Sequence, residues 1–263
     1  MWERIPEEIR LYLPNVQGQE NLMGMSGAQV ICFDDLVLKI QPDGPMPANE
    51  HRMLRYLQGK LPAPQLVAEA LQDGWRYLLM SRVPGEYLCC EAVLDDQRLL
   101  ASRMAEALQL LWAVDITDCP TRRTVDVRLA EIEEGLRTGR ITRDTACHED
   151  LYGPGGFASP EALYEYLCRN RPEEELVLSH GDFCLPNVFT DGKTLTGLID
   201  LGYAGAADRW VDIEKGLWSM WANTTGVFGG KKRSFDRQLL FDALSMKPDE
   251  EKLRYFSLLD SME

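Results

Sequence analysis

The N-terminal third of the chain alternates short apolar runs with tight-turn signals such as Asp34-Asp35 and Asp73-Gly74, a pattern typical of antiparallel strands. Strands are predicted at 29–33, 36–40, 66–71 and 75–83. Between the two strand pairs, apolar residues at helical spacing in 49–58 precede Gly59 and predict a helix with Glu50 in its first turn. A shorter amphipathic helix is expected at 6–13. The pattern predicts a small sheet with one main helix.

Beyond Pro84-Gly85 the apolar residues recur at helical spacing over longer stretches. Helices are predicted at 97–114, 124–136 and 160–168. A further helix is expected over an apolar stripe that we place in the core, formed by Trp210, Leu217, Trp218 and Trp221. The change of pattern divides the chain into lobes of residues 1–82 and 83–263. The predicted fold class is α+β, with a small antiparallel β lobe followed by a larger, mainly helical lobe.

Composition adds limits on partners and location. With 263 residues, 45% of them apolar, the chain can bury a sizeable core in one large domain or two modest lobes. The net charge of −14 disfavours nucleic acid and anionic membranes and favours polycationic ligands, although many cytosolic proteins are acidic for solubility alone. Seven cysteines without metal-binding spacing predict free thiols in a reducing compartment. No apolar run has the length of a signal or a membrane span, so we expect a cytoplasmic protein. The acidic surface favours a monomer only weakly, and a monomer or weak dimer is expected.

The segment around Asp182 is the strongest candidate for chemistry. Asp182 follows an apolar strand, Asn187 lies in the same loop, and the turn signal Asp191-Gly192 predicts a hairpin that returns Asp200 to the same place. Asp182 can accept the proton of a substrate hydroxyl, while Asn187 and Asp200 offer hard oxygens to the magnesium of a nucleotide. Asp and Asn are also common turn residues. Their order and spacing together favour a phosphotransfer site.

A second group of residues in the N-terminal lobe suits nucleotide phosphates. Gly24-Met25-Ser26-Gly27 precedes a strand and can bring backbone N–H groups close to phosphate oxygens, although such a turn is often only a hairpin. Lys39 in the next strand can reach the phosphates, and Glu50 on the following helix can hold it as an ion pair. Taken singly, both charges are ordinary surface residues. Their order before the catalytic segment favours the nucleotide-binding interpretation.

These motifs resemble those of the aminoglycoside phosphotransferases, most of all the aminoglycoside 3'-phosphotransferases, which are antibiotic-resistance kinases with a protein-kinase-like fold. The resemblance covers nearly the whole chain. It rests on Gly24 to Ala28, Gly59 to Pro64, His180 to Asn187, Ile199 to Gly202, Ala207 to Ile213, Lys247 to Asp249 and Leu258 to Asp260. It implies a bilobal kinase in which residues 1–82 bind the nucleotide and residues 83–263 carry catalysis and the substrate.

On the nucleotide side, the resemblance implies an adenine pocket between the lobes. Its residues are Met80 and Ile199, which line the pocket, and Ser81 and Val83, whose backbone groups pair with the base. Val37 stands where an aromatic ring is expected to stack on adenine. The resemblance also implies that Asp208 and Asp212 are structural and tie down the catalytic segment.

On the acceptor side, the resemblance implies an acidic loop and a C-terminal segment that bind the polycationic sugar. The residues that fit are Glu149, Asp150, Tyr203, Asp260 and Glu263, the last through its side-chain and terminal carboxylates. Tyr203 stands where an arginine is frequent, and residues 151–156 are less acidic than expected, which leaves the substrate range open.

The expected function is transfer of the γ-phosphate of ATP or GTP to a hydroxyl of an aminoglycoside, with Mg²⁺ held by Asn187 and Asp200 and Asp182 as the base. The 3'-hydroxyl is the expected acceptor. Two alternatives stay open: a kinase for another small alcohol of the choline, sugar or macrolide type, and a non-catalytic nucleotide-binding module. The first shares every residue on the nucleotide side, and the second is disfavoured because Lys39, Asp182, Asn187 and Asp200 are all present.

Overall fold

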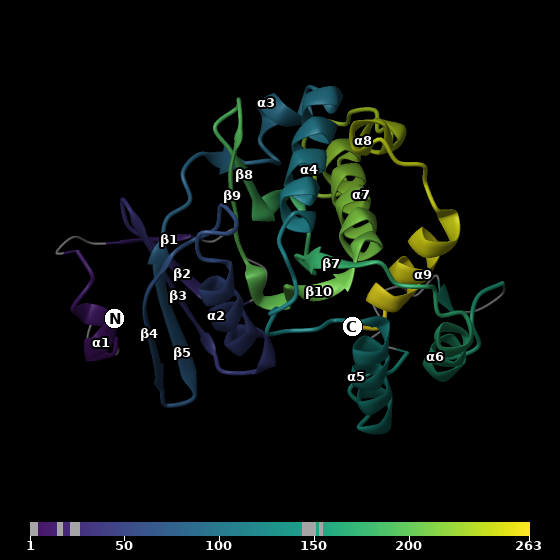
Figure 1. The fold of residues 1–263 in the computed structure, drawn as a ribbon, viewed down its shortest axis with the longest axis horizontal. Coiled ribbons are helices and arrows are strands. Elements are labelled where there is room, and N and C mark those ends of the chain that lie inside the picture. Colours follow the sequence, from purple (N-terminus) through teal and green to yellow (C-terminus); the bar gives the residue numbers. More distant parts are fainter. Residues whose placement is uncertain (1–4, 15–17, 22–26, 144–150, 153–154) are drawn as a thin grey trace.

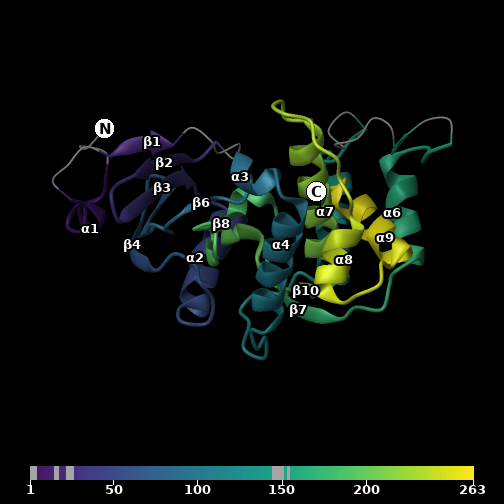
Figure 2. The same ribbon diagram turned by 90° about the horizontal axis from the view of Figure 1, so that it is seen from above.

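The computed structural model describes residues 5–14, 18–21, 27–143, 151–152 and 155–263. It has a sheet-rich part and a helix-rich part, with helix α2 between the large sheet and the rest of the chain (Figures 1 and 2). The five-stranded antiparallel sheet contains, in spatial order, β1 (Gln19–Asn21), β2 (Gln29–Cys32), β3 (Leu36–Pro42), β5 (Trp75–Ser81) and β4 (Leu66–Gln72). The α+β fold class and the two predicted hairpins are confirmed.

The turn between β4 and β5 shows why the sequence signal for this hairpin is strong. Asp73 and Gly74 have φ values of +52° and +77°, the left-handed pair that a two-residue hairpin loop requires. Gly adopts this conformation without strain, and Asp tolerates it better than most residues. The resulting register sets Val37 opposite Met80 in the neighbouring strand.

Helix α2 (Pro45–Leu57) begins earlier than the sequence pattern predicted. The predicted start at Asn49 is wrong, so Glu50 lies in the second turn rather than the first. Pro45 and Pro47 lie in the first turn, which accepts proline because the N–H groups there have no intrahelical partner. Helix α1 (Glu7–Arg10) is shorter than the predicted 6–13 and buries Ile9 against the large sheet.

The second part of the chain is mainly helical, as predicted. Its helices are α3 (Glu91–Leu94), α4 (Gln97–Trp112), α5 (Val125–Arg137), α6 (Pro160–Arg169), α7 (Arg209–Thr225), α8 (Gln238–Leu244) and α9 (Glu250–Asp260). Two small antiparallel sheets lie among them, one made of β6 (Glu86–Tyr87), β8 (Val188–Thr190) and β9 (Leu195–Leu198), the other of β7 (Leu176–Ser179) and β10 (Gly205–Asp208). Short 3-10 turns η3 (Leu185–Asn187) and η4 (Leu201–Tyr203) follow the catalytic candidates.

The predicted apolar stripe on α7 is only partly correct. Trp210 is buried, but Trp218 and Trp221 are each 42% exposed, so their predicted core role is wrong. The buried face of this helix is formed by Ile213, Leu217 and Met220. Trp218 lies off that face at 100° per residue, whereas Trp221 continues the row of Ile213 and Leu217 but is exposed near the end of the helix. Phe228 packs edge-on against Trp218 at the surface.

The hydrophobic core joins the two parts of the chain. One cluster of buried side chains runs from Met53 and Leu57 on α2 to Leu108 on α4 and Phe183 in the catalytic segment. Helix α2 is therefore packed against both the large sheet and the helical part. The predicted lobe boundary at 82/83 falls between β5 and β6 and stays a prediction. Among the described residues, no helix is long and apolar enough to cross a membrane, and the cysteines are free thiols.

Candidate active site

The catalytic candidate Asp182 lies in a loop directly after β7, and a buried carboxylate fixes the backbone of that loop. Asp212 on α7 accepts hydrogen bonds from Ser179 Oγ (3.0 Å), His180 N (2.8 Å) and Gly181 N (2.9 Å). Gly181 has φ +78°, and a Cβ there would clash with the carbonyl of Tyr203. Only glycine fits that combination of conformation and close approach.

Asp208 anchors the neighbouring chain segments in the same way. Its carboxylate caps α7 by accepting from Trp210 N (2.8 Å) and also accepts from Glu175 N (2.9 Å) and Lys252 Nζ (2.8 Å). Asp208 and Asp212 are both fully buried. Their contacts agree with the structural roles expected for them.

The side chains of Asp182 and Asn187 are directly linked. Asn187 Nδ2 donates to the backbone oxygen of Asp182 (2.9 Å) and to its carboxylate Oδ2 (3.1 Å). The Asn187 amide nitrogen is thereby committed, and its amide oxygen is the atom left for a cation. His180 makes two further hydrogen bonds in this loop. Its Nδ1 accepts from Asp182 N (3.3 Å), so the ring proton is on Nε2, which donates to Ile199 O (2.8 Å).

Asp200 follows β9 and joins this group from another direction. Its backbone is left-handed (φ +58°, ψ +56°), which is unusual for a residue other than glycine. Ile199 N donates to Asn187 O (3.0 Å), so the two predicted metal ligands lie on adjoining segments. The hairpin prediction for this region is confirmed by the antiparallel pairing of β8 with β9.

Lys39 connects the sheet to Asp200. Its ammonium donates to Glu50 Oε1 (3.0 Å) and Oε2 (2.9 Å) and to Asp200 Oδ1 (2.5 Å). Burial lowers the pKa of Lys39, but the negative charges of Glu50 and Asp200 outweigh it, so the pKa lies above the ordinary lysine value. Lys39 is therefore a permanent cation next to the catalytic segment.

Cys184 lies in the same loop as Asp182 but is not a candidate nucleophile. Burial, followed by the negative charge of Asp182, raises the pKa of its thiol to about 12. A thiolate is the reactive form of cysteine. Cys184 therefore stays protonated, and Asp182 stays the candidate proton acceptor of this loop.

The predicted adenine-pocket residues cluster where β5 leaves the large sheet. Met80 and Val83 are buried, and Ile199 is half-buried. Ser81 N already donates to Gln65 O (2.9 Å), so the N–H of this residue is not available to pair with a base. Ser26, the predicted phosphate-binding residue, lies outside the described residues.

The predicted acceptor-side residues are brought together only in part. Tyr203 is 43% exposed, and it lines a small cavity beside Gly181 together with Glu263, Arg123 and Arg128. Glu149 and Asp150 lie outside the described residues.

The two acidic acceptor-side candidates in the described region are already paired with cations. Asp260 accepts from Lys215 Nζ (2.7 Å), and the side chain of Glu263 accepts from Arg128 Nε (2.8 Å) and Nη2 (2.9 Å). The buried charge of Arg128 helps hold the pKa of Glu263 below its ordinary value, against the opposing effect of burial. The side-chain carboxylate of Glu263 is therefore paired with Arg128, and its role toward a substrate ammonium group stays a prediction.

Lys215 and Arg128 were missed by the sequence analysis. Each is a single charged residue on an amphipathic helix, and its partner lies far along the chain, so no local pattern marks it. Lys215 also lies close enough to Asp182 for that carboxylate to raise the pKa of the lysine.

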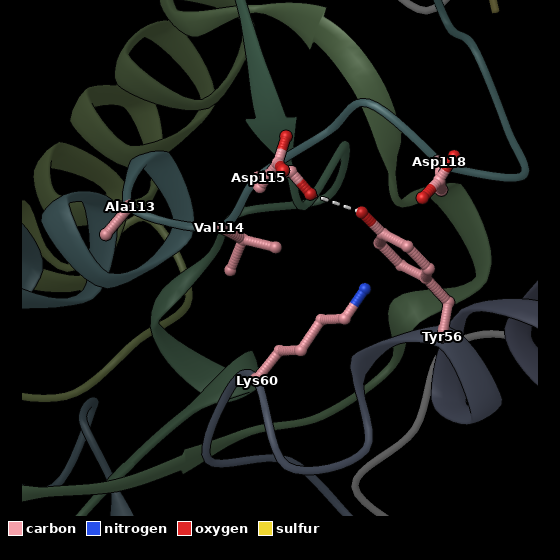
Figure 3. Close-up of a pocket in the computed structure, with 6 residues that line it drawn as sticks. All are labelled: Tyr56, Lys60, Ala113, Val114, Asp115 and Asp118. Carbon is pink, nitrogen blue, oxygen red and sulfur yellow. Dashed lines mark hydrogen bonds between the residues drawn. The ribbon is translucent and has the colours of Figure 1, made fainter.

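A pocket of about 330 Å³ lies between the end of α2 and the segment after α4 (Figure 3). It is lined by Tyr56, Lys60, Ala113, Val114, Asp115 and Asp118. None of these belongs to the predicted site. The Lys60 ammonium already lies 3.5 Å from the centre of the Tyr56 ring.

The donor set suits magnesium rather than a metal held by the protein alone. Within the described ranges, no three His, Cys, Asp or Glu side chains lie together as a metal site. Magnesium commonly takes one or two protein oxygens and completes its shell with phosphate oxygens and water. The Asn187 amide oxygen and the Asp200 carboxylate match that requirement.

The fold and this arrangement of Lys39, Asp182, Asn187 and Asp200 define a phosphotransferase. The chain belongs to the phosphotransferase enzyme family, whose model matches residues 23–256. It is 34% identical to an aminoglycoside 3'-phosphotransferase of Enterococcus faecalis, over 98% of both chains. An aminoglycoside 3'-phosphotransferase of Niallia circulans is 32% identical over 97% of this chain and 96% of its own.

Solved structures confirm the protein-kinase-like fold. An aminoglycoside 3'-phosphotransferase of type VIII superposes with a TM-score of 0.75 at 24% identity, covering 97% of this chain and 98% of that chain. A Streptomyces rimosus aminoglycoside phosphotransferase, in complex with ADP and streptomycin, superposes with a TM-score of 0.73 at 20% identity, covering 97% of this chain and 96% of that chain. The family resemblance inferred from the sequence motifs is therefore correct.

Proposed function

We propose that this protein transfers the γ-phosphate of ATP or GTP to the 3'-hydroxyl of aminoglycoside antibiotics and thereby confers resistance to them. The supporting observation is similarity over nearly the full length to aminoglycoside 3'-phosphotransferases, combined with the convergence of Lys39, Asp182, Asn187 and Asp200. The net charge of −14 favours long-range attraction of a polycationic substrate.

In the proposed mechanism, Asp182 orients the acceptor hydroxyl and takes its proton. The acceptor oxygen forms a bond to the γ-phosphorus while the bond from that phosphorus to the β–γ bridging oxygen breaks, which leaves a nucleoside diphosphate. The hydrogen bond from Asn187 Nδ2 to Asp182 Oδ2 (3.1 Å) fixes the Asp182 carboxylate, so it meets the acceptor hydroxyl in one orientation. Because the transition state is loose, positioning and charge neutralisation supply most of the acceleration.

The phosphates are bound by the other groups of the site. Lys39, held by Glu50, binds the α- and β-phosphates, and Ser26 is a further proposed phosphate-binding residue. Asn187 and Asp200 would hold magnesium, which would neutralise charge on the phosphate oxygens of the bound nucleotide. The base is bound by Ser81 and Val83 and enclosed by Met80 and Ile199. The proposed acceptor-binding residues are Tyr203, Asp260 and Glu263, with Glu149 and Asp150.

The direct test is nucleoside diphosphate release by the purified protein with ATP or GTP, magnesium and a panel of acceptors. Kanamycin and neomycin are expected to be turned over, whereas lividomycin, which lacks the 3'-hydroxyl, is expected to be inert. Turnover of lividomycin would move the site of transfer to another hydroxyl. Turnover only of choline, sugars or macrolides would replace the proposal with a kinase for a different small alcohol.

The pairing of Asp260 with Lys215 gives a prediction on acceptor affinity. Asp260 is paired with two cations, Lys215 Nζ at 2.7 Å and Arg128 Nη2 at 4.0 Å. Lys215→Met removes the nearer one, and the Asp260 carboxylate then has room for an ammonium group of the substrate. We expect KM for kanamycin to fall about three- to tenfold, the scale of one partly exposed ion pair. Steady-state kinetics at saturating ATP measures this change.

Lys231→Met is the matched control for Lys215→Met, because Lys231 pairs with Asp95 at the same distance of 2.7 Å. Its KM for kanamycin should equal that of the parent. An unchanged or raised KM in Lys215→Met would remove Asp260 from the acceptor site.

A further inference from the structure

Asn49 joins α2 to two other segments of the chain, one at Thr121 and one at Gly202 and Ala204. Its Nδ2 donates to Gly202 O (2.9 Å) and to Ala204 O (2.8 Å), and its Oδ1 accepts from Thr121 Oγ1 (2.5 Å). Asn49 is only 5% exposed, so these bonds are shielded from water. Both ends of the amide are satisfied by groups of the helical part of the chain, although α2 packs on the large sheet.

The segments that Asn49 contacts are themselves fixed. Thr121 O accepts from Ala206 N (2.8 Å) at the start of β10, the strand that pairs with β7 ahead of the catalytic loop. At Gly202, an added Cβ would lie 2.5 Å from Met46 Sδ and 3.4 Å from Met46 O, so the first turn of α2 approaches this residue closely. Helix α2 is therefore seated directly on the turn η4 that follows Asp200.

The position of Asp200 depends on hydrogen bonds to the backbone just before and just after it in the chain. Its left-handed backbone is a conformation that a non-glycine residue keeps only when its surroundings enforce it. On the N-terminal side, His180 Nε2 holds the carbonyl of Ile199 (2.8 Å). On the C-terminal side, Asn49 holds the carbonyls of Gly202 and Ala204.

Asn49 and Glu50 are neighbours on α2 and reach the same segment by two routes. Glu50 holds Lys39, which contacts the Asp200 side chain, while Asn49 holds the backbone that follows Asp200. The contacts form a closed ring from α2 to Asp200 and back to α2. Displacement of either half of the ring moves the Asp200 carboxylate relative to Asn187.

We propose that Asn49 is a positioning residue for magnesium binding, acting by fixing the backbone after Asp200. The proposal rests on the magnesium role proposed above for Asp200. Groups that orient a metal ligand without touching the metal commonly change metal affinity by about ten- to hundredfold when they are removed. The effect is expected on magnesium, with nucleotide affinity in the absence of metal preserved, because Lys39 and Glu50 stay in place.

A purely structural role for Asn49 would give a different result, and Tyr56 provides the comparison. Tyr56 lies on the same helix, and its hydroxyl donates to Asp115 O (2.5 Å), as Figure 3 shows. This bond also joins α2 to the helical part of the chain but does not involve the segment after Asp200. Tyr56→Phe therefore weakens the same junction without loosening Asp200.

The experiment is calorimetric titration of ADP into the full-length protein, with saturating magnesium and with EDTA. The ratio of the two dissociation constants measures how much magnesium strengthens ADP binding. Asn49→Asp keeps the shape of the side chain but replaces the donating nitrogen with an oxygen that faces two carbonyls. The ratio is expected to fall about tenfold in this variant, with the dissociation constant in EDTA changed less than about twofold. Asn49→Ala is the second variant should Asn49→Asp not fold.

Two results would overturn the proposal. One is an Asn49 variant that melts at a lower temperature but keeps the parental ratio, and the other is a Tyr56→Phe variant whose ratio falls equally. Asp200→Ala, measured in the same way, tests the underlying assignment separately. If Asp200→Ala keeps the parental ratio, the proposed magnesium ligand itself is wrong, whatever the Asn49 variants show.

Discussion

Asp182→Asn is expected to lower kcat for kanamycin phosphorylation by about a hundredfold or more, within the range of losses caused by removing a general base. The amide has nearly the shape of the carboxylate and keeps an oxygen that can accept from Asn187, so the loop should hold its geometry. It cannot take the proton of the acceptor hydroxyl. Steady-state release of ADP, measured at saturating nucleotide and kanamycin, gives the effect on kcat.

The control for this variant is Asp242→Asn, an exposed position on α8 whose carboxylate contacts only Gln238 among the hydrogen bonds in the described part of the chain. Its kcat should match that of the parent. The dissociation constant for ADP should be similar in all three proteins, because in the proposed mechanism Asp182 binds the acceptor rather than the nucleotide. A kcat of Asp182→Asn within about threefold of the parent would rule out Asp182 as the base.

Asp200→Ala is expected to abolish magnesium-dependent turnover. This variant removes the one carboxylate among the two proposed magnesium ligands, and the neutral amide of Asn187 cannot replace its charge. Lys39 also loses its contact with the catalytic segment but keeps Glu50. The measurement is ADP release over a magnesium titration, in which the variant should stay at the rate of the uncatalysed background.

A matched control separates the loss of magnesium from backbone strain. Asp73 has φ +52°, close to the +58° of Asp200, but lies in the turn between β4 and β5. Asp73→Ala therefore imposes a similar strain on a left-handed residue outside the site and should retain full activity. Magnesium-dependent turnover by Asp200→Ala would contradict the assignment of Asp200 as a metal ligand.

Much of the fold follows from local patterns. The hairpin around Asp73 and Gly74 was predicted because its turn chemistry and its strand alternation agree. The start of α2 was not, because Pro45 and Pro47 favour a loop in sequence while the first helical turn accepts them in structure. On α7 the helical spacing was correct, yet spacing alone does not reveal which of Trp210, Trp218 and Trp221 meets another element.

The candidate site, like the fold, has some residues that the sequence predicts and others that only tertiary packing reveals. Asp182, Asn187 and Asp200 were identifiable because one loop and one hairpin carry them in a short stretch, so their convergence depends on local structure. Asn49 and Lys215 act on partners distant in sequence, and each looks like an ordinary helical residue until the helices pack. The sequence therefore predicts the chemical groups of this kinase, while tertiary packing determines how they are held.

The carboxylate of Asp212 has a consequence for how this enzyme loses activity. The groups that donate to it lie 31 to 33 residues earlier in the chain, so the backbone before Asp182 is ordered only when α7 has docked on β7. If α7 detaches on heating, three hydrogen bonds break together and a buried charge loses its partners. Thermal inactivation should therefore coincide with melting of the helical part, without a partly unfolded form that still phosphorylates its substrate.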